Sequence, residues 1–194
     1  NSNPWYVGRP SAGYVNAVHP GYSDFRNRYK NRKPVVYVGA NDGMLHGFDA
    51  SVLSTGEPTA TAGNEVIAYV PSQVYVNLNR LPARTYLKNH RYFVDGSPFV
   101  GDAYLSTLEG GDADKWRSVL VSGLNSGGKG LFALDVTNPD LSGTGINAPT
   151  FTVANAASLL LWEFTDAHDG DVGYVVNVPP QTNLTGQAKQ IAKM

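Results

Sequence analysis

The sequence predicts an all-β protein: an incomplete β-propeller of several four-stranded antiparallel blades, with one or two short helices in its loops. Three observations predict this fold class. The 194 residues are poor in charge (16%) but contain 21 Gly and 12 Pro, which favour tight turns, and 11 Tyr, which favours strands. A strand–turn–strand pattern occupies residues 35–49, and a similar pattern returns at residues 119–137.

The first 34 residues are expected to form an irregular connector, with the partial propeller domain following at residues 35–194. This connector is rich in Asn, Gly, Pro, Tyr and Arg without a sustained period. A short helix is expected over Ser23–Lys33, because Ser23 is a good N-cap and Tyr22, Phe25 and Tyr29 share one face. The basic residues of this stretch are interpreted as a solvated helix face.

The first hairpin is predicted over Val35–Asp49. Val35–Gly39 is rich in β-branched residues, and a second apolar run covers Met44–Asp49. The Asp42-Gly43 pair between them suits a tight hairpin turn, because both residue types tolerate the positive φ that such turns need.

Further strands and one more short helix follow the first hairpin. Ser72–Leu81 places Val74, Leu78 and Leu81 at helical spacing. The remaining strand candidates are Val66–Val70, Arg91–Val94, Pro98–Leu105, Ser118–Ser122, Leu131–Val136, Leu159–Phe164 and Gly173–Val178.

The hairpin recurs with an offset of 84 to 86 residues. Val119–Gly123 matches Val35–Gly39, and both copies end in Asp-x-Ser/Thr, at Asp49 and Asp135. In this motif the Asp side chain accepts backbone N–H bonds and closes the strand. Propeller blades commonly repeat every 40–50 residues. The spacing therefore predicts a further, degenerate blade at Arg91–Leu105, with a β-sandwich as the alternative.

Composition and charge argue against several partners. The net charge of −1 gives no electrostatic case for nucleic acid or for an anionic membrane as partner, and the lack of Cys excludes disulfides and thiolate metal sites. No run of 18 apolar residues exists, so no membrane-spanning segment is predicted. The chain opens at Asn1 without a signal peptide and is expected to be a mature, excised or incomplete stretch.

The Gly123–Gly130 loop resembles a phosphate-binding loop in six positions. Gly130 replaces the Ser or Thr that would hold magnesium, and a strand-like run follows instead of a helix. We therefore predict a glycine-rich hairpin turn and no nucleotide site.

No catalytic, cofactor or metal site is predicted. Asp166, Asp169 and Asp171 were the strongest metal candidates, but His168 and Gly170 occupy positions where a calcium loop needs oxygen ligands. Asp95 and Asp102 are interpreted as strand-end or turn residues. The four His residues show no metal-binding or catalytic spacing; they are His19, His46, His90 and His168.

Several segments together resemble the C-terminal propeller of the PilC/PilY family of type IV pilus biogenesis and tip-associated adhesin proteins. They match in order and spacing over roughly residues 22–194. These segments are Val35–Ala50, Ala68–Ser72, His90–Pro98, Val119–Pro139, Leu161–Phe164 and Asp171–Tyr174.

The resemblance implies a non-enzymatic, exported protein at the outer membrane, pilus tip or cell surface of a Gram-negative bacterium. Expected partners are minor pilins of the pilus-tip complex and a host or abiotic surface, with roles in pilus assembly, extension, attachment and twitching motility. No cofactor is expected in this segment. The family's DxDxNxxxD calcium loop does not occur in this sequence, so calcium is expected only in the full-length protein. Exposed aromatics among Trp5, Tyr6, Tyr14 and Tyr22 are candidates for partner contacts, but packing against neighbouring blades outside this chain is the favoured interpretation.

Two alternatives remain. The first hairpin also resembles the repeat of quinoprotein dehydrogenase propellers, which bind pyrroloquinoline quinone and calcium. Such enzymes of the alcohol dehydrogenase type carry a vicinal Cys pair, and this chain has no Cys. An outer-membrane assembly scaffold of propeller type is the other alternative.

Overall fold

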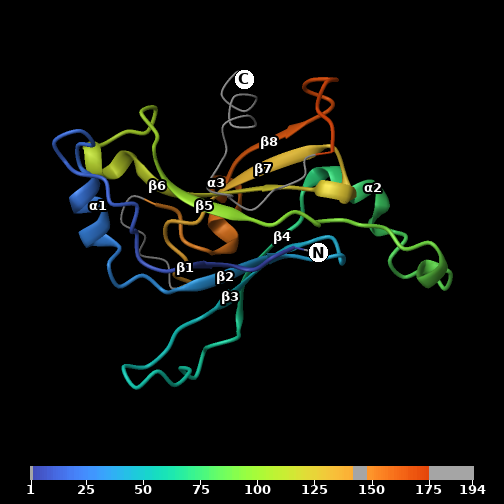
Figure 1. Ribbon diagram of the computed structural model, residues 1–194, viewed down its shortest axis with the longest axis horizontal. Coiled ribbons are helices and arrows are strands. Elements are labelled where there is room, and N and C mark those ends of the chain that lie inside the picture. The colour runs from blue at the N-terminus through green and yellow to red at the C-terminus, as the bar shows by residue number, and fades with distance from the viewer. Residues whose placement is uncertain (1, 142–147, 175–194) are drawn as a thin grey trace, which may run out of the picture.

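The computed structural model describes residues 2–141 and 148–174, and it places them in two four-stranded antiparallel sheets (Figure 1). Within each sheet the strands lie side by side in sequence order. This meander is the arrangement expected of propeller blades. The all-β prediction of four-stranded antiparallel blades is confirmed.

The first sheet contains β1 (Trp5–Val7), β2 (Val35–Gly39), β3 (Leu45–Asp49) and β4 (Glu65–Tyr69). The hairpin β2–β3 pairs Val35 with Asp49 and Gly39 with Leu45, so the predicted hairpin is confirmed. Alternate residues of both strands are buried, because the side chains of a strand point to opposite faces in turn.

The second sheet contains β5 (Phe99–Tyr104), β6 (Trp116–Gly123), β7 (Gly130–Asp135) and β8 (Leu160–Thr165). It repeats the first sheet closely. In both sheets the last pairing shifts register, between Gly47 and Phe48 in one and between Ala133 and Leu134 in the other. The repeat seen in the sequence is therefore a repeat of blades.

The expected intermediate blade at Arg91–Leu105 is wrong. Phe99–Tyr104 is the first strand of the second sheet, and Arg91–Val94 is not a strand. The offset of 84 to 86 residues therefore spans one blade plus a long connection. The backbone of Phe93 and Val94 bonds to the first hairpin's turn, which removes it from strand pairing. Of the strand expected at Gly173–Val178, residues 175–178 lie outside the described residues, and Gly173 and Tyr174 are not strand.

Helices connect and cover the strands. The predicted helix after Ser72 is present as η1 (Ser72–Val74) and α2 (Tyr75–Leu78). The other short helices are α3 (Ala156–Leu159), η2 (Tyr86–Lys88), η3 (Asp112–Lys115), η4 (Asn125–Gly127) and η5 (Val153–Asn155).

Helix α1 (Tyr22–Arg28) overlaps the helix predicted over Ser23–Lys33, but it begins at Tyr22 and ends at Arg28, before the predicted end. Its N-cap is Gly21, with φ of 77°, and a Cβ there would come within 2.4 Å of the Ala113 amide nitrogen. Ser23 is thus a helical residue and not the cap. The segment 1–34, expected to be irregular apart from this helix, also supplies β1.

Two hydrophobic cores hold the molecule together. The larger one joins the two sheets through residues such as Tyr37, Leu45, Phe93, Leu120 and Phe132. The smaller one lies under α1, where the buried side chains are Tyr22, Phe25, Tyr29, Trp116 and Ala148. In the described part of the chain, no helix has both the length and the apolar character needed to cross a membrane.

Candidate functional site at the joint between the sheets

The segment Phe93–Ser97, here called the joint segment, runs between the turns of the two hairpins. Phe93 and Val94 are fully buried in the larger core. On the side of the first hairpin, the Phe93 amide donates to Asn41 Oδ1 at 3.2 Å, and the Val94 amide donates to the Ala40 carbonyl at 3.2 Å. The first turn therefore satisfies backbone groups that a strand would otherwise pair.

The second hairpin's turn holds the other half of the joint segment. Asn125 Nδ2 donates to the Asp95 carbonyl at 3.2 Å, and Ser122 Oγ donates to the Gly96 carbonyl at 3.4 Å. One short segment is thus bonded to both hairpins, and it fixes the position of each sheet relative to the other.

Glycine allows the backbones at this joint to approach closely. A Cβ on Gly96 would lie 1.8 Å from the Gly123 carbonyl oxygen, and one on Gly127 would lie 1.6 Å from the Phe93 carbonyl oxygen. Neither position tolerates a side chain without movement of the backbone. This close approach explains why Gly127 of the Gly123–Gly130 loop is a glycine. The loop contains only the three-residue η4 and leads into strand β7, as predicted.

A buried polar network ties the N-terminal segment to the second sheet. Asp102 accepts hydrogen bonds from the Tyr22 hydroxyl and Ser118 Oγ, both at 2.7 Å. Arg32 Nη1 donates to Ser118 Oγ at 2.7 Å, and Arg32 Nε donates to the Gly8 carbonyl at 2.5 Å. Burial, followed by the Asp102 carboxylate, raises the pKa of Tyr22 well above its usual value.

Sequence reasoning missed this network, because its hydrogen-bonded side chains lie up to 86 residues apart and share no spacing. Asp102, interpreted from the sequence as a strand-end or turn residue, lies within β5 and is an acceptor in this network.

The two hairpins end in equivalent carboxylates. Asp49 accepts from the Ser51 amide at 2.9 Å, and Asp135 accepts from the Thr137 amide at 3.0 Å. The predicted Asp-x-Ser/Thr closure is therefore confirmed in both copies. Asp135 also pairs with Arg117 Nε at 2.9 Å, and both side chains of that ion pair are buried.

Lys33 Nζ pairs with Asp49 at 2.9 Å. Burial alone would raise the pKa of Asp49, but hydrogen bonds from Ser51 and Lys33 outweigh it and hold that pKa well below its usual value.

Glu163 on β8 forms a second connection between the sheets. Its carboxylate accepts hydrogen bonds from the Ser72 amide at 2.9 Å and from the hydroxyls of Ser72 and Tyr69. Burial acts to raise the pKa of Glu163, but these hydrogen bonds outweigh it, so the pKa is lowered. The outer strand of the second sheet is thus bound to the end of β4.

The His residues have separate surroundings. His46 bonds Glu65 at 2.5 Å and Asp42 at 2.9 Å through its two ring nitrogens. Partial burial acts to lower the pKa of His46, but the two carboxylates outweigh it and raise that pKa. His19 packs against Trp116, His90 lies between Tyr86 and Tyr92, and His168 bonds Thr165.

Two of the three candidate metal ligands, Asp166 and Asp169, accept hydrogen bonds within the fold. Asp166 accepts from Gln73 Nε2 at 2.9 Å, and Asp169 accepts from the Asp171 amide at 3.0 Å. Over residues 2–141 and 148–174, no three His, Asp or Glu side chains form a group that could hold a metal ion.

The four N-terminal aromatics differ in exposure. Tyr6 is 63% exposed, Tyr14 is 37% exposed, and Trp5 packs 4.9 Å from the Phe99 ring. Tyr22 is fully buried, so it is not a surface contact residue.

Comparison with known proteins gives one consistent family. The model of the PilY1 beta-propeller domain matches residues 1–183. The type IV pilus biogenesis factor PilY1 of Pseudomonas aeruginosa is 41% identical over 95% of this chain, which covers 13% of that relative. A PilY1 homolog of Xylella fastidiosa is 39% identical over 92% of the chain, which covers 12% of it.

A solved structure agrees with this assignment. The crystal structure of the Pseudomonas aeruginosa PilY1 C-terminal domain is similar with a TM-score of 0.54 and 36% identity. The match covers 87% of this chain and 26% of that chain. The chain spans about an eighth of the length of its curated relatives, and it belongs to the PilY1 β-propeller domain family.

Proposed function

We propose that this chain is a non-catalytic propeller portion of a type IV pilus biogenesis and tip adhesin protein. It supports pilus assembly and extension, surface attachment and twitching motility. Its relatives are named pilus biogenesis factors, which supports a role in the cell envelope or at the cell surface.

The observation that carries the proposal is the joint segment. Segments of the family pattern meet there: the Ala40-Asn41 turn, Phe93–Ser97 and the Gly123–Gly130 loop. Their side chains and backbones fix one blade against the next. We infer a scaffold that presents its surface loops in a set arrangement, because rigid frameworks commonly carry binding function on their loops.

The proposed partners are minor pilins of the tip complex and a host or abiotic surface. The proposed location is the outer membrane or the pilus tip of a Gram-negative bacterium. We propose no cofactor for this segment, and we propose calcium binding only for the full-length protein.

Deletion of the gene in the bacterium that encodes it tests the proposal. We expect loss of surface pili, counted by electron microscopy of sheared fractions, and loss of the twitching zone on agar. The wild-type gene and a Gly170→Ala variant should restore both. Intact pili and twitching after deletion would overturn the proposal. A quinone that copurifies with the full-length protein, together with alcohol-dependent dye reduction, would favour the dehydrogenase alternative.

A further inference from the structure

A loop of uncompensated positive charge projects from one end of the molecule. It comprises residues 79–92, here called the basic loop, and connects α2 to the joint segment. It contains Arg80, Arg84, Lys88 and Arg91, and no Asp or Glu occurs anywhere between Val66 and Val94. This part of a nearly neutral chain therefore carries a charge of about +4.

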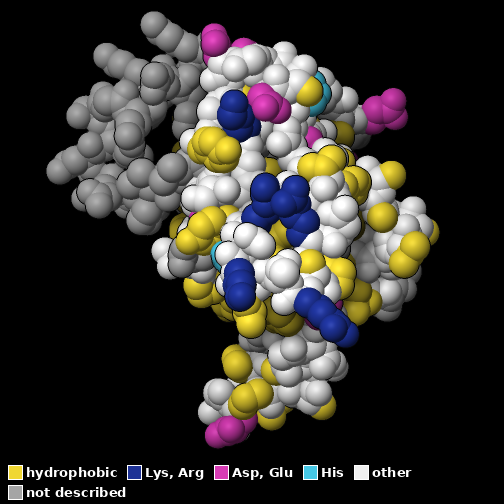
Figure 2. Space-filling model, turned by 90° about the vertical axis from the view of Figure 1, so that its right-hand side faces the viewer, with side chains coloured by type: hydrophobic (Ala, Val, Ile, Leu, Met, Phe, Trp, Pro, Cys, Tyr) yellow, Lys and Arg dark blue, Asp and Glu magenta, His cyan; other side chains and the backbone are white. Residues whose placement is uncertain are grey.

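The four cations of the basic loop are exposed and unpaired. All four side chains face solvent. Among the described residues, the basic side chains in ion pairs are those of Arg28, Lys33, His46 and Arg117, none of them in this loop. Figure 2 looks onto the end of the molecule from which the loop projects, and Lys and Arg side chains lie there among hydrophobic ones. Such a surface attracts anions.

Internal hydrogen bonds determine the shape of the loop. The Ala83 amide bonds the Arg80 carbonyl at 3.1 Å, the Tyr86 amide bonds the Ala83 carbonyl at 2.9 Å, and the Lys88 amide bonds the Thr85 carbonyl at 3.0 Å. Leu81 and Tyr86 are partly buried and pack against the larger core. The loop is thus anchored through two inward-facing side chains.

Tyr86 faces inward, whereas its neighbour Leu87 is 94% exposed. Lys88 follows it directly, and Arg84 lies three residues before it. Other exposed apolar or aromatic residues at the ends of this stretch are Tyr75 (58%), Val76 (76%) and Tyr92 (42%). An open hollow of about 540 Å³ lies in the loop, lined by residues that include Arg80, Tyr86, His90 and Arg91.

Exposed leucine, tyrosine and arginine together fit a lipid surface better than a soluble anion. Leu87 would gain from entering the acyl boundary, while flanking cations keep their charge at the headgroup level. The loop has no strand that could pair with an extended acidic peptide. Tyr86, His90 and Tyr92 pack tilted or edge-on against one another, which does not form a platform for stacked bases.

We propose that the basic loop is a docking surface for an anionic membrane, with Leu87 entering the lipid and Arg80, Arg84, Lys88 and Arg91 contacting phosphate-bearing headgroups. Arginine suits such headgroups because its planar fork can bond two phosphate oxygens. This proposal goes beyond the proposed pilus function and can fail independently of it.

Flotation of the purified full-length protein with lipid vesicles tests the proposal. We expect binding to vesicles of phosphatidylglycerol with phosphatidylcholine and none to phosphatidylcholine alone. A quadruple Gln variant of the four cations should bind more than a hundredfold more weakly, because each cation near an anionic surface contributes about fivefold in affinity. Leu87→Ser should weaken binding about tenfold.

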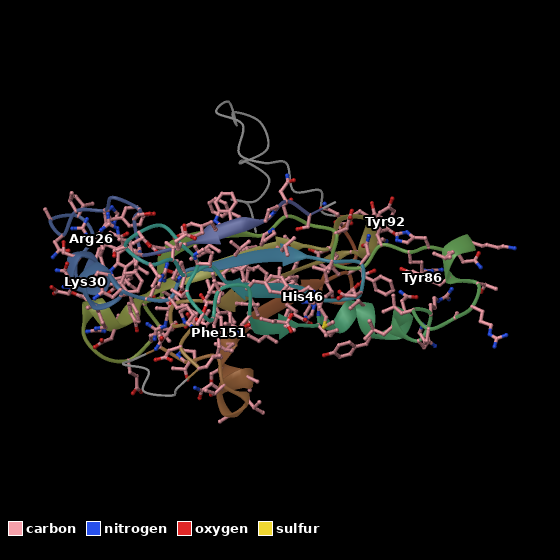
Figure 3. The ribbon with its side chains drawn as sticks, turned by 90° about the horizontal axis from the view of Figure 1, so that it is seen from below. Arg26, Lys30, His46, Tyr86, Tyr92 and Phe151 are labelled. Carbon is pink, nitrogen blue, oxygen red and sulfur yellow. The ribbon has the colours of Figure 1, made fainter. Side chains whose placement is uncertain are left out.

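Matched variants at other exposed positions control for charge and hydrophobicity. Arg26→Gln with Lys30→Gln removes two exposed cations at the opposite end of the molecule from Tyr86 and Tyr92 (Figure 3). Val153→Ser removes a side chain that is 96% exposed. Both controls should bind vesicles like the wild type, and all variants should keep the wild-type unfolding midpoint because every altered side chain is exposed.

Three results would overturn the proposal. The first is equal binding to anionic and neutral vesicles, and the second is vesicle binding that the control charge variant weakens as much as the quadruple variant does. The third is unchanged vesicle binding by Leu87→Ser together with tight, charge-dependent binding of soluble heparin. That last result would assign the loop to an anionic polymer. The pilus count and the twitching zone measure the proposed function separately, so the two failures are distinguishable.

Discussion

Replacing Gly127 by Ala tests whether the joint segment holds the two sheets together. Gly127 has no positive φ, so an alanine there meets no conformational penalty of the left-handed kind. The new methyl group would lie 1.6 Å from the Phe93 carbonyl oxygen and 2.4 Å from the Phe93 carbonyl carbon. Both atoms are backbone, so no side-chain rotation can relieve the contact.

The cost is therefore at the upper end of the range for inserting a group into a packed interior, about 3 kcal/mol in the free energy of unfolding. For a domain of this size that corresponds to a fall in the midpoint of thermal unfolding on the order of 10 °C. Guanidinium unfolding followed by tryptophan fluorescence should show a lower midpoint with an unchanged slope, as expected when stability alone changes.

Gly170→Ala is the matched control, because a Cβ at Gly170 meets no heavy atom within 4 Å. It should change the free energy of unfolding by no more than about 0.5 kcal/mol. If Gly127→Ala unfolds at the same midpoint as Gly170→Ala, Gly127 does not contact the Phe93 backbone closely. The joint segment would then not hold the two sheets together.

Three further predictions concern ionisable groups within and between the two sheets. Glu163→Gln removes a charged acceptor of several hydrogen bonds and should cost about 1–3 kcal/mol in denaturant unfolding. Asp135→Asn leaves Arg117 buried without its ionic partner and should cost about 3–5 kcal/mol, whereas Asp49→Asn, whose lysine partner is more exposed, should cost less. The raised pKa of His46 stabilises the fold fully below about pH 6.5, and this contribution should disappear as pH rises through the folded pKa, an effect absent from His46→Gln.

Each of these predictions has a result that contradicts it. Equal losses for Asp135→Asn and Asp49→Asn would show that burial of the arginine partner does not determine the cost. A parallel pH dependence of stability in wild type and His46→Gln between pH 6 and 8 would show that the two carboxylates beside His46 contribute nothing. An unchanged unfolding midpoint in Glu163→Gln would show that β4 and β8 do not depend on this contact.

The local structure could be predicted from the sequence because its causes are local. Two apolar runs, Val35–Gly39 and Met44–Asp49, flank an Asp-Gly turn, and this local pattern predicts the hairpin. The closure of each hairpin by Asp49 and Asp135 also depends on residues only two positions apart. At these positions the structure predicted from the sequence is the structure observed.

Blade count and the buried polar network could not be predicted in this way. The count depended on a typical repeat length, whereas the real interval contains α2, the basic loop and the joint segment before β5 begins. The network of Tyr22, Asp102, Ser118 and Arg32 joins three parts of the chain that only the packed fold brings together. Sequence spacing carries no information about such contacts, because their geometry is set by how the two sheets pack.

Contacts within the fold also indicate which residues remain available to bind other molecules. The residues that resemble known catalytic or ligand-binding motifs, namely the Gly123–Gly130 loop, Asp102 and Asp166, are each engaged in contacts that support the fold. The basic loop differs, because its cations have no ion-pair partner within the described part of the chain and Leu87 contributes nothing to the core. An exposed loop of unpaired cations and apolar side chains on a rigid framework is the arrangement expected of an interaction surface. The basic loop is therefore the first surface to test for binding.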